Sequence, residues 1–215
     1  GLEGNLLMRQ KKPLDAAKAY REALAREPLP ILAVSLYSAL QAAGRKDQAA
    51  AMAQQWQKEH PKDVVLLTLQ GQQALLAKDY KTALPALNAA RQLSKEQYYN
   101  LASLRIMLSQ FYLKDRAALT KEVNSFMSNS PNTNVPPEVL EWLGIGYYND
   151  KNFQAAEKYL SALRKIDNPG GVKPDFLFYL GDTATKLKNL PEAEDAFGKY
   201  LQTAKDPAGK AKVLL

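Results

Sequence analysis

A repeated spacing of residues constrains the fold of this chain more than any other feature of its sequence. Six times, a residue within one expected helix is followed twelve positions later by a residue near the start of the next, and successive occurrences lie 33 to 37 residues apart. Helix-turn-helix units stack into solenoids at this interval. Most of the paired residues are small: Gly4/Ala16, Tyr37/Ala49, Gly71/Ala83, Met107/Leu119, Gly144/Ala156 and Gly181/Ala193.

The spacing predicts an all-α chain folded as a right-handed α-solenoid of about six helix-turn-helix units. Because each unit of a solenoid packs only on its neighbours, residues 1–215 are expected to form a single array rather than separate globular domains. The expected units cover about residues 1–28, 30–61, 64–95, 97–131, 136–169 and 174–207, and the start of a further helix covers 208–215.

Individual residues mark where several helices begin and end. Pro13 stands at the expected start of a second helix, where no backbone hydrogen bond is lost. Pro28 and Pro61 stand where helices stop, since proline cannot continue a helix. Gly44 is a C-cap candidate, and Asp79 is placed to cap the helix that follows it.

The units resemble the tetratricopeptide repeat (TPR). That family has a glycine or alanine midway along the first helix, and later an alanine, an aromatic residue, an alanine and a proline. The resemblance implies that the two small residues let paired helices approach closely and that the aromatic residue fills the gap they leave. Unit one carries the pattern in Gly4, Leu7, Ala16, Tyr20, Ala23 and Pro28, and units five and six carry most of it in Gly144, Tyr147, Ala156, Leu160, Gly181, Ala193 and Phe197.

Unit four, over residues 97–131, keeps the period but loses the signature. It has Met107 and Leu119 where the other units use small residues. We expect the array to be least regular over 97–137. Sequence drift and a functional hinge both explain such a departure, and drift is the simpler interpretation.

The TPR resemblance implies that the first helix of each unit lines a concave face along which ligands lie. Helical spacing from the glycine positions indicates which residues face that groove. In the first half the predicted residues are neutral and polar or apolar: Val34, Ser38, Gln41, Thr68, Gln72 and Leu75. In the second half they are acidic and aromatic, and they form the candidate partner-binding site: Glu138, Glu141, Ile145, Tyr148, Asp175, Phe178 and Asp182. The alternative interpretation is that these residues are only the solvated ends of core helices.

No pattern of residues points to an enzyme, a cofactor or a metal. The chain has no cysteine and one histidine, His60, which stands at a helix end beside Pro61. Gly144 and Gly146 fall inside an expected helix, so they are no dinucleotide-binding loop. The acidic residues of the second half lack the desolvated cleft that acid–base catalysis requires.

Charge and hydropathy exclude two further classes of partner. The net charge is +7, but the excess of lysine and arginine is spread along residues 1–130 without a dense cluster. Nucleic-acid binding would need basic residues gathered on one face, so we expect none. No run of 18 uncharged apolar residues occurs, so we expect no membrane span in this sequence.

The expected function is that of a non-catalytic protein–protein interaction scaffold that binds a protein or peptide segment in its groove. Residues 36–87 are similar to bacterial TPR proteins of exopolysaccharide export and exosortase-type sorting, which implies a role in the cell envelope. The lack of cysteine also favours the periplasm over the cytoplasm. The alternative is a polysaccharide-handling module in which Tyr148 and Phe178 stack on sugar rings.

Overall fold

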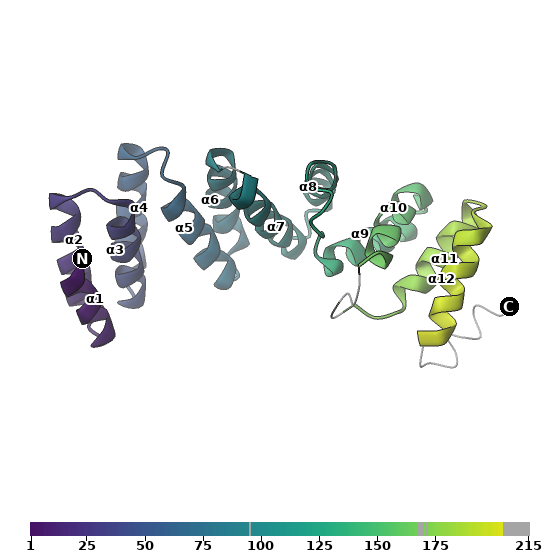
Figure 1. The fold of residues 1–215 in the computed structure, drawn as a ribbon, viewed down its shortest axis with the longest axis horizontal. Helices are drawn as coiled ribbons and strands as arrows, with labels where there is room; N and C mark the ends of the chain where they lie inside the picture. The colour runs from purple at the N-terminus through teal and green to yellow at the C-terminus, as the bar shows by residue number, and fades with distance from the viewer. Residues whose placement is uncertain (95, 167–169, 171, 204–215) are drawn as a thin grey trace. The chain divides into compact units, whose positions relative to one another are not determined.

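The computed structural model describes residues 1–94, 96–166, 170 and 172–203, and in this part of the chain it contains helices and no strand (Figure 1). The helices form six consecutive pairs, which confirms the predicted all-α fold of helix-turn-helix units. They are α1 (Leu2–Arg9), α2 (Pro13–Arg26), α3 (Pro30–Ala42), α4 (Lys46–Glu59), α5 (Val64–Leu76), α6 (Tyr80–Leu93), α7 (Glu96–Tyr112), α8 (Arg116–Asn129), α9 (Pro137–Asn149), α10 (Phe153–Arg164), α11 (Phe176–Lys186) and α12 (Leu190–Thr203).

The chain divides into two compact parts, Gly1–Ser109 and Gln110–Leu215. The boundary falls inside α7, the first helix of the unit that lacks the small-residue signature. That residues 1–215 form one solenoid stays a prediction. The further helix predicted over 208–215 lies outside the described residues.

Buried glycines allow close packing of the paired helices in four of the units. A Cβ atom placed on any of these glycines would lie 2.5–2.6 Å from the side chain sixteen residues later in the chain. No real Cβ atom tolerates such a contact, so the glycine is a packing requirement. This confirms the predicted close approach for these pairs: Gly4 with Tyr20, Gly71 with Leu87, Gly144 with Leu160, and Gly181 with Phe197.

Unit two achieves the same fit with the two sizes exchanged. Tyr37 stands where the other units have glycine, and Ala53 stands sixteen residues later, where they have a large side chain. Both are buried in one apolar cluster built from α2, α3, α4 and the start of α5, which also includes Trp56. Unit two therefore still combines one small and one large residue at these two positions.

The turn between the two helices of every unit contains one residue in the left-handed region. In the fifth turn, Lys151 donates its backbone N–H to the carbonyl of Tyr148, and Asn152 donates to the carbonyl of Tyr147, both at 2.9 Å. This is the Schellman arrangement, which usually places glycine at the left-handed position. Here that position holds lysine in five of six turns, with φ between 57° and 73°: Lys11, Gly44, Lys78, Lys114, Lys151 and Lys188.

We predict that Lys151→Gly stabilises the protein by about 1 kcal/mol, because a side chain at positive φ costs roughly this much and glycine does not carry that cost. Urea denaturation followed by circular dichroism measures the change. Gly44→Lys is the matched control and should destabilise by a similar amount, since nothing lies within 4 Å of a Cβ at Gly44 and only the backbone changes. An unchanged midpoint in both variants would contradict the strain assigned to these turns.

Candidate functional site

Two neighbouring first helices, α9 and α11, carry all seven residues predicted for the candidate site. The helices contact one another within the part Gln110–Leu215. Asp175 is the N-cap residue of α11 and is exposed, and the other six are partly buried along the two helices. We call these seven residues the docking face: Glu138, Glu141, Ile145, Tyr148, Asp175, Phe178 and Asp182.

A hydrogen bond between Tyr148 and Asp182 joins α9 to α11. The Tyr148 hydroxyl donates to Asp182 Oδ2 at 2.7 Å. The Tyr148 ring meets Tyr179 and Phe153 edge-on, with centroids 5.1 and 6.0 Å apart. Burial, followed by the hydrogen bond to Asp182 and its charge, raises the pKa of Tyr148 to about 12. The phenol therefore stays protonated and keeps donating at every physiological pH.

We predict that Asp182→Asn lowers the pKa of Tyr148 from about 12 part of the way towards 10, because the carboxylate is removed while burial remains. NMR of ¹³Cζ-labelled tyrosine measures this titration. The raised pKa favours the neutral phenol in the folded state, so its contribution to stability is present below pH 10 and is lost between about pH 10 and 12. An unchanged Tyr148 pKa in the variant would show that Asp182 does not act on the phenol.

Three residues of the docking face line a pocket of about 330 Å³. Glu138, Glu141 and Ile145 share it with Phe111, at the end of α7, and with Trp142. Phe111 and Trp142 pack edge to face, with centroids 5.7 Å apart. Gly146 and Asn149 complete the lining, so the pocket has an aromatic wall and an acidic rim. We call it the Trp142 pocket.

Lys114 places its ammonium group over the same aromatic wall. Its Nζ lies 4.6 Å from the centre of the Phe111 ring and 5.4 Å from the centre of the Trp142 ring. Both distances are within the range of a cation–π interaction. The left-handed backbone at Lys114, with φ 60°, is part of the turn from which this side chain extends.

The rim of the pocket is negatively polarised. Burial raises the pKa of the Glu141 carboxyl; the charge of Asp175 raises it further, and Lys173 acts in the opposite direction. Glu141 and Asp175 therefore repel one another across α9 and α11. Two carboxylates held in this way are stabilised by an added cation.

Phe178 packs against the second helix of its own unit. Its ring is tilted against Phe197 and Tyr200 of α12, with centroids 6.1 and 5.9 Å away. The structure thus groups Glu138, Glu141 and Ile145 at the Trp142 pocket and joins Tyr148 to Asp182, whereas Phe178 packs on α12.

The aromatic wall formed by Phe111 and Trp142 was not predicted from the sequence, although the sequence contains a signal for it. Phe111 lies four residues after Met107, as Tyr148 lies four residues after Gly144. The spacing that predicted Tyr148 for the candidate site would therefore also have predicted Phe111 in unit four. Trp142 is one of two tryptophans in the chain and follows Glu141 directly.

The groove residues predicted for the first half are neutral in the structure as well, but several are already bonded. Gln72 accepts a hydrogen bond from Arg105 at 3.2 Å, and Gln41 donates to the Tyr37 hydroxyl at 3.2 Å. Thr68 donates to the carbonyl of Val64 on its own helix. This surface offers neither a cluster of charge nor an exposed ring to a ligand.

Two larger cavities lie away from the docking face. One, of about 830 Å³, is lined by glutamine and alanine residues of the part Gly1–Ser109, among them Gln54, Gln57 and Ala50. The other, of about 810 Å³, borders the second helices α8, α10 and α12. Their volumes exceed that of the Trp142 pocket. The first offers mainly neutral amides and methyl groups, and in the second the charged residues Glu157, Arg164 and Glu192 already have partners.

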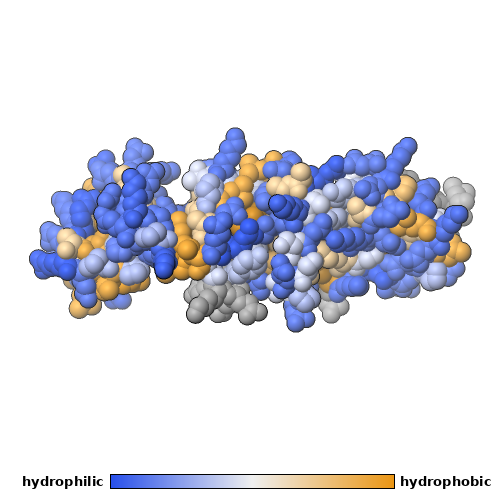
Figure 2. All heavy atoms as spheres, turned by 90° about the horizontal axis from the view of Figure 1, so that it is seen from above, coloured by the Kyte–Doolittle hydropathy of each residue, from blue (hydrophilic) through white to orange (hydrophobic). Residues whose placement is uncertain are grey.

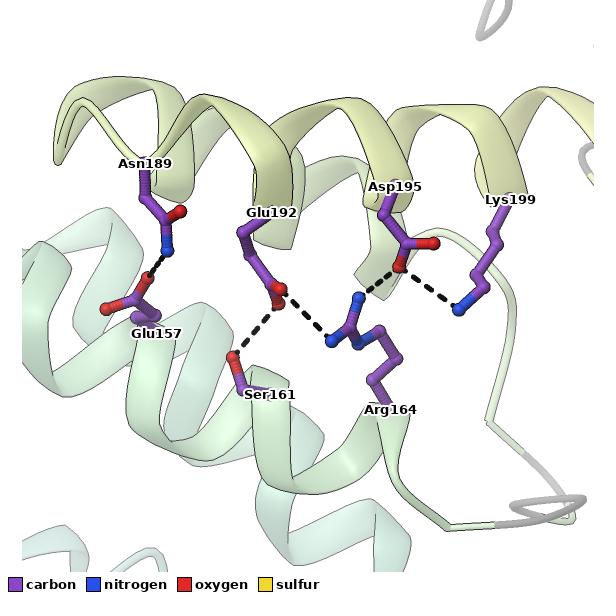
Figure 3. A network of polar contacts seen from close by, with 7 residues as sticks. All are labelled: Glu157, Ser161, Arg164, Asn189, Glu192, Asp195 and Lys199. Atoms are coloured by element: carbon purple, nitrogen blue, oxygen red, sulfur yellow. Dashed lines mark hydrogen bonds and ion pairs between the residues drawn. The ribbon is translucent and has the colours of Figure 1, made fainter.

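Those paired charges form a ladder between α10 and α12 (Figure 3). Arg164 Nη2 lies 3.0 Å from Glu192, whose side chain is 16% exposed, and Arg164 Nη1 bonds Asp195. The ladder consists of Glu157, Ser161, Arg164, Asn189, Glu192, Asp195 and Lys199. Because its members satisfy one another, it stabilises the contact between units five and six.

The single histidine also has a structural role. His60 is the C-cap residue of α4, and its ring stacks on Trp56 with centroids 3.8 Å apart. Trp56 in turn donates to Asp63 at 2.5 Å. Within the described residues no group of three or more His, Cys, Asp or Glu side chains could hold a metal ion.

Most of the face shown in Figure 2 is covered by hydrophilic residues, with hydrophobic atoms visible between them. Most lysine and arginine residues in the described part of the chain are exposed, and they are spread along its helices and turns. None of the described helices has the length and apolar character needed to cross a membrane.

The sequence profile of the tetratricopeptide repeat matches residues 2–37 and 138–209. These segments make up half of the chain and include units one, five and six, which carry the glycine–alanine pairs. The chain therefore belongs to the tetratricopeptide repeat family. Repeats of this family generally serve as non-catalytic scaffolds. No curated protein matches the chain.

Several solved structures share the fold. YrrB, described as a TPR protein with an unusual peptide-binding site, is 15% identical over 92% of this chain and 98% of its own, with a TM-score of 0.58. The structure of Naa15/Naa10 bound to HypK-THB is 16% identical over 98% of this chain but only 32% of that one, with a TM-score of 0.64. PilF of Pseudomonas aeruginosa is 15% identical over 99% of this chain and 94% of its own, with a TM-score of 0.50. At these identities the likeness establishes the fold alone.

Proposed function

We propose that the chain is a non-catalytic protein–protein interaction scaffold that docks an extended partner segment along the docking face of α9 and α11. The observation that carries this proposal is the Tyr148–Asp182 hydrogen bond, which joins the first helices of two units into one acidic and aromatic surface. Family membership supports the scaffold role, and the peptide-binding site described for YrrB gives a precedent within the fold.

Charge supports a segment that carries positive charge as the partner. The docking face contributes four carboxylates, whereas the chain as a whole has a net charge of +7. An acidic surface on a basic protein steers basic segments towards one place and away from the rest. The proposed cellular setting is the bacterial envelope, including exopolysaccharide assembly, and it rests on the sequence similarity of residues 36–87.

A polysaccharide partner is the alternative, with Tyr148 and Phe178 as the stacking rings. The contacts of these rings favour a peptide instead. Tyr148 is held by Tyr179 and Phe153, and Phe178 by Phe197 and Tyr200. Rings held in this way have less free face for a sugar. Binding on a glycan array that Tyr148→Ala abolishes would favour the alternative.

The test of the proposed function begins with selection of random dodecapeptides displayed on phage against the whole chain. The tightest peptide is then synthesised and its affinity measured by calorimetry. We expect Tyr148→Ala and Asp182→Lys each to weaken binding at least tenfold. The loss follows from removal of one side of the Tyr148–Asp182 link and, for lysine, from reversal of the charge.

Glu194→Lys is the matched control, because Glu194 is an exposed acid of α12 outside the docking face. It should change the affinity less than twofold, and circular dichroism should show all three variants folded. If Asp182→Lys and Glu194→Lys lower the affinity equally, the loss comes from the change in net charge. The docking face would then not be the surface that binds the peptide. A selection that yields no binding peptide would overturn the scaffold proposal itself.

A further inference from the structure

We propose that the Trp142 pocket binds one cationic side chain, a lysine or an arginine, of the docked partner segment. This inference rests on the proposed function and deepens it, because it assigns the chemistry of one position in the partner. It depends on three features of the pocket: its shape, the cation that already lies on its wall, and the charge of its rim.

The shape suits a single long side chain. A cavity of about 330 Å³ is at the lower end of ligand-binding pockets, too small for a folded element and large enough for one extended side chain. Ile145 and the aromatic wall provide apolar surface for methylene groups. Glu138 and Glu141 provide acceptors at the rim for a charged head. Lysine and arginine have this combination of an apolar stem and a cationic end.

Lys114 shows that the aromatic wall accepts a cation. Its ammonium lies over both Phe111 and Trp142, at cation–π distances, although Lys114 itself is an exposed residue of a turn. The protein thus places its own cation on the wall that a partner cation would use. Lys114 should compete with the partner's cation for the two rings, and its removal should strengthen cation binding.

The charged groups around the pocket leave a net negative rim. Glu138, Glu141 and Asp175 provide carboxylates, and Lys114 and Lys173 provide opposing charges. A further basic group, the guanidinium of Arg116, stands beside Gly146 on the pocket wall.

The Arg116 charge is already neutralised locally. Arg116 pairs with Asp150, and its guanidinium lies 5.1 Å from the centre of the Tyr147 ring. Arg116 therefore adds little net charge at the pocket. An incoming cation therefore meets the carboxylates of Glu138 and Glu141, and it offsets the repulsion that Asp175 exerts on Glu141.

The first test uses small probes that need no knowledge of the partner. N-acetyl-arginine methylamide and its neutral counterpart, N-acetyl-norleucine methylamide, are titrated into ¹⁵N-labelled protein while the two tryptophan indole signals are followed by NMR. We expect the arginine probe to shift the Trp142 indole and to leave the Trp56 indole unchanged, because Trp56 is bonded to Asp63 elsewhere. The norleucine probe should shift neither signal.

Two variants sharpen this test. Lys114→Ala should bind the arginine probe about threefold more tightly, because the competing ammonium is gone. Glu141→Gln should bind it about tenfold more weakly while keeping the side-chain shape. Equal shifts of the Trp142 indole by both probes, or no shift by the arginine probe at 50 mM in either wild type or Lys114→Ala, would overturn the assignment of a cation pocket.

The second test uses the dodecapeptide selected against the whole chain. Each arginine or lysine is replaced in turn by citrulline or norleucine, which are uncharged. One replacement should weaken binding at least tenfold in the wild type and less than twofold in Glu141→Gln, because the two changes remove the same interaction.

The outcomes separate the two proposals. If peptide binding depends on Asp182 but tolerates every neutral replacement, the scaffold proposal is supported and the cation-pocket proposal is overturned. An arginine probe that shifts the Trp142 indole when no peptide binds supports the pocket and overturns the scaffold.

Discussion

Gly144→Ala is expected to destabilise the protein by about 1–3 kcal/mol, although alanine is the better helix former. The new Cβ would lie 2.6 Å from both Cγ and Cδ2 of Leu160 and 3.4 Å from its backbone nitrogen. Leu160 is fully buried, so its side chain cannot move aside without disturbing the α9–α10 contact. Urea denaturation followed by circular dichroism measures the loss.

Gly198→Ala is the matched control, and it should change stability in the opposite direction to Gly144→Ala. Gly198 lies within α12, and nothing stands within 4 Å of a Cβ placed there. We expect this variant to stabilise the protein by about 0.5–1 kcal/mol through helix propensity alone. If the two variants shift stability in the same direction, the buried glycines are not packing requirements and the explanation of the repeat spacing is wrong.

Arg164→Ala is expected to cost about 2 kcal/mol, because it removes the cation at the centre of the ladder between α10 and α12. Arg164 is 22% exposed and Glu192 is 16% exposed, so the pair is shielded from solvent more than a surface ion pair. The substitution leaves the Glu192 carboxylate without its ion pair in a confined position. Thermal and urea unfolding should both report the loss.

Lys199→Ala is the control for the ladder. Lys199 pairs with Asp195 at 3.1 Å, but both side chains are about half exposed, at 51% and 46%. Exposed pairs of this kind contribute about 0.3–0.5 kcal/mol. A loss for Arg164→Ala no larger than that for Lys199→Ala would show that the ladder does not stabilise the contact between units five and six.

The helical repeat was predictable because the close packing of its paired helices requires a particular residue at single positions. Only glycine fits at Gly4, Gly71, Gly144 and Gly181, so the spacing of these residues carries the fold. In unit two the large residue, Tyr37, stands at the first position and the small one, Ala53, at the second. This sequence signal is weaker, because it is visible only when both positions are compared.

The binding surface was predictable only in part. Helical spacing placed Glu138, Glu141 and Ile145 together, but it could not show that Phe111, from the preceding unit, closes their pocket. That contact depends on how neighbouring first helices pack, which one helix's spacing does not determine. The contact of Lys114 with both rings was also hidden, because it joins a turn residue to side chains of two helices, α7 and α9.

The most direct test of the docking face is a map of backbone amide shifts in ¹H–¹⁵N spectra of the whole chain titrated with the selected dodecapeptide. We expect the largest shifts along α9 and α11 and at the Trp142 indole, with the Tyr148 and Asp182 amides among them. Shifts concentrated instead on α4 and α6, or on the α10–α12 ladder, would contradict the assignment of α9 and α11 as the surface that binds the partner.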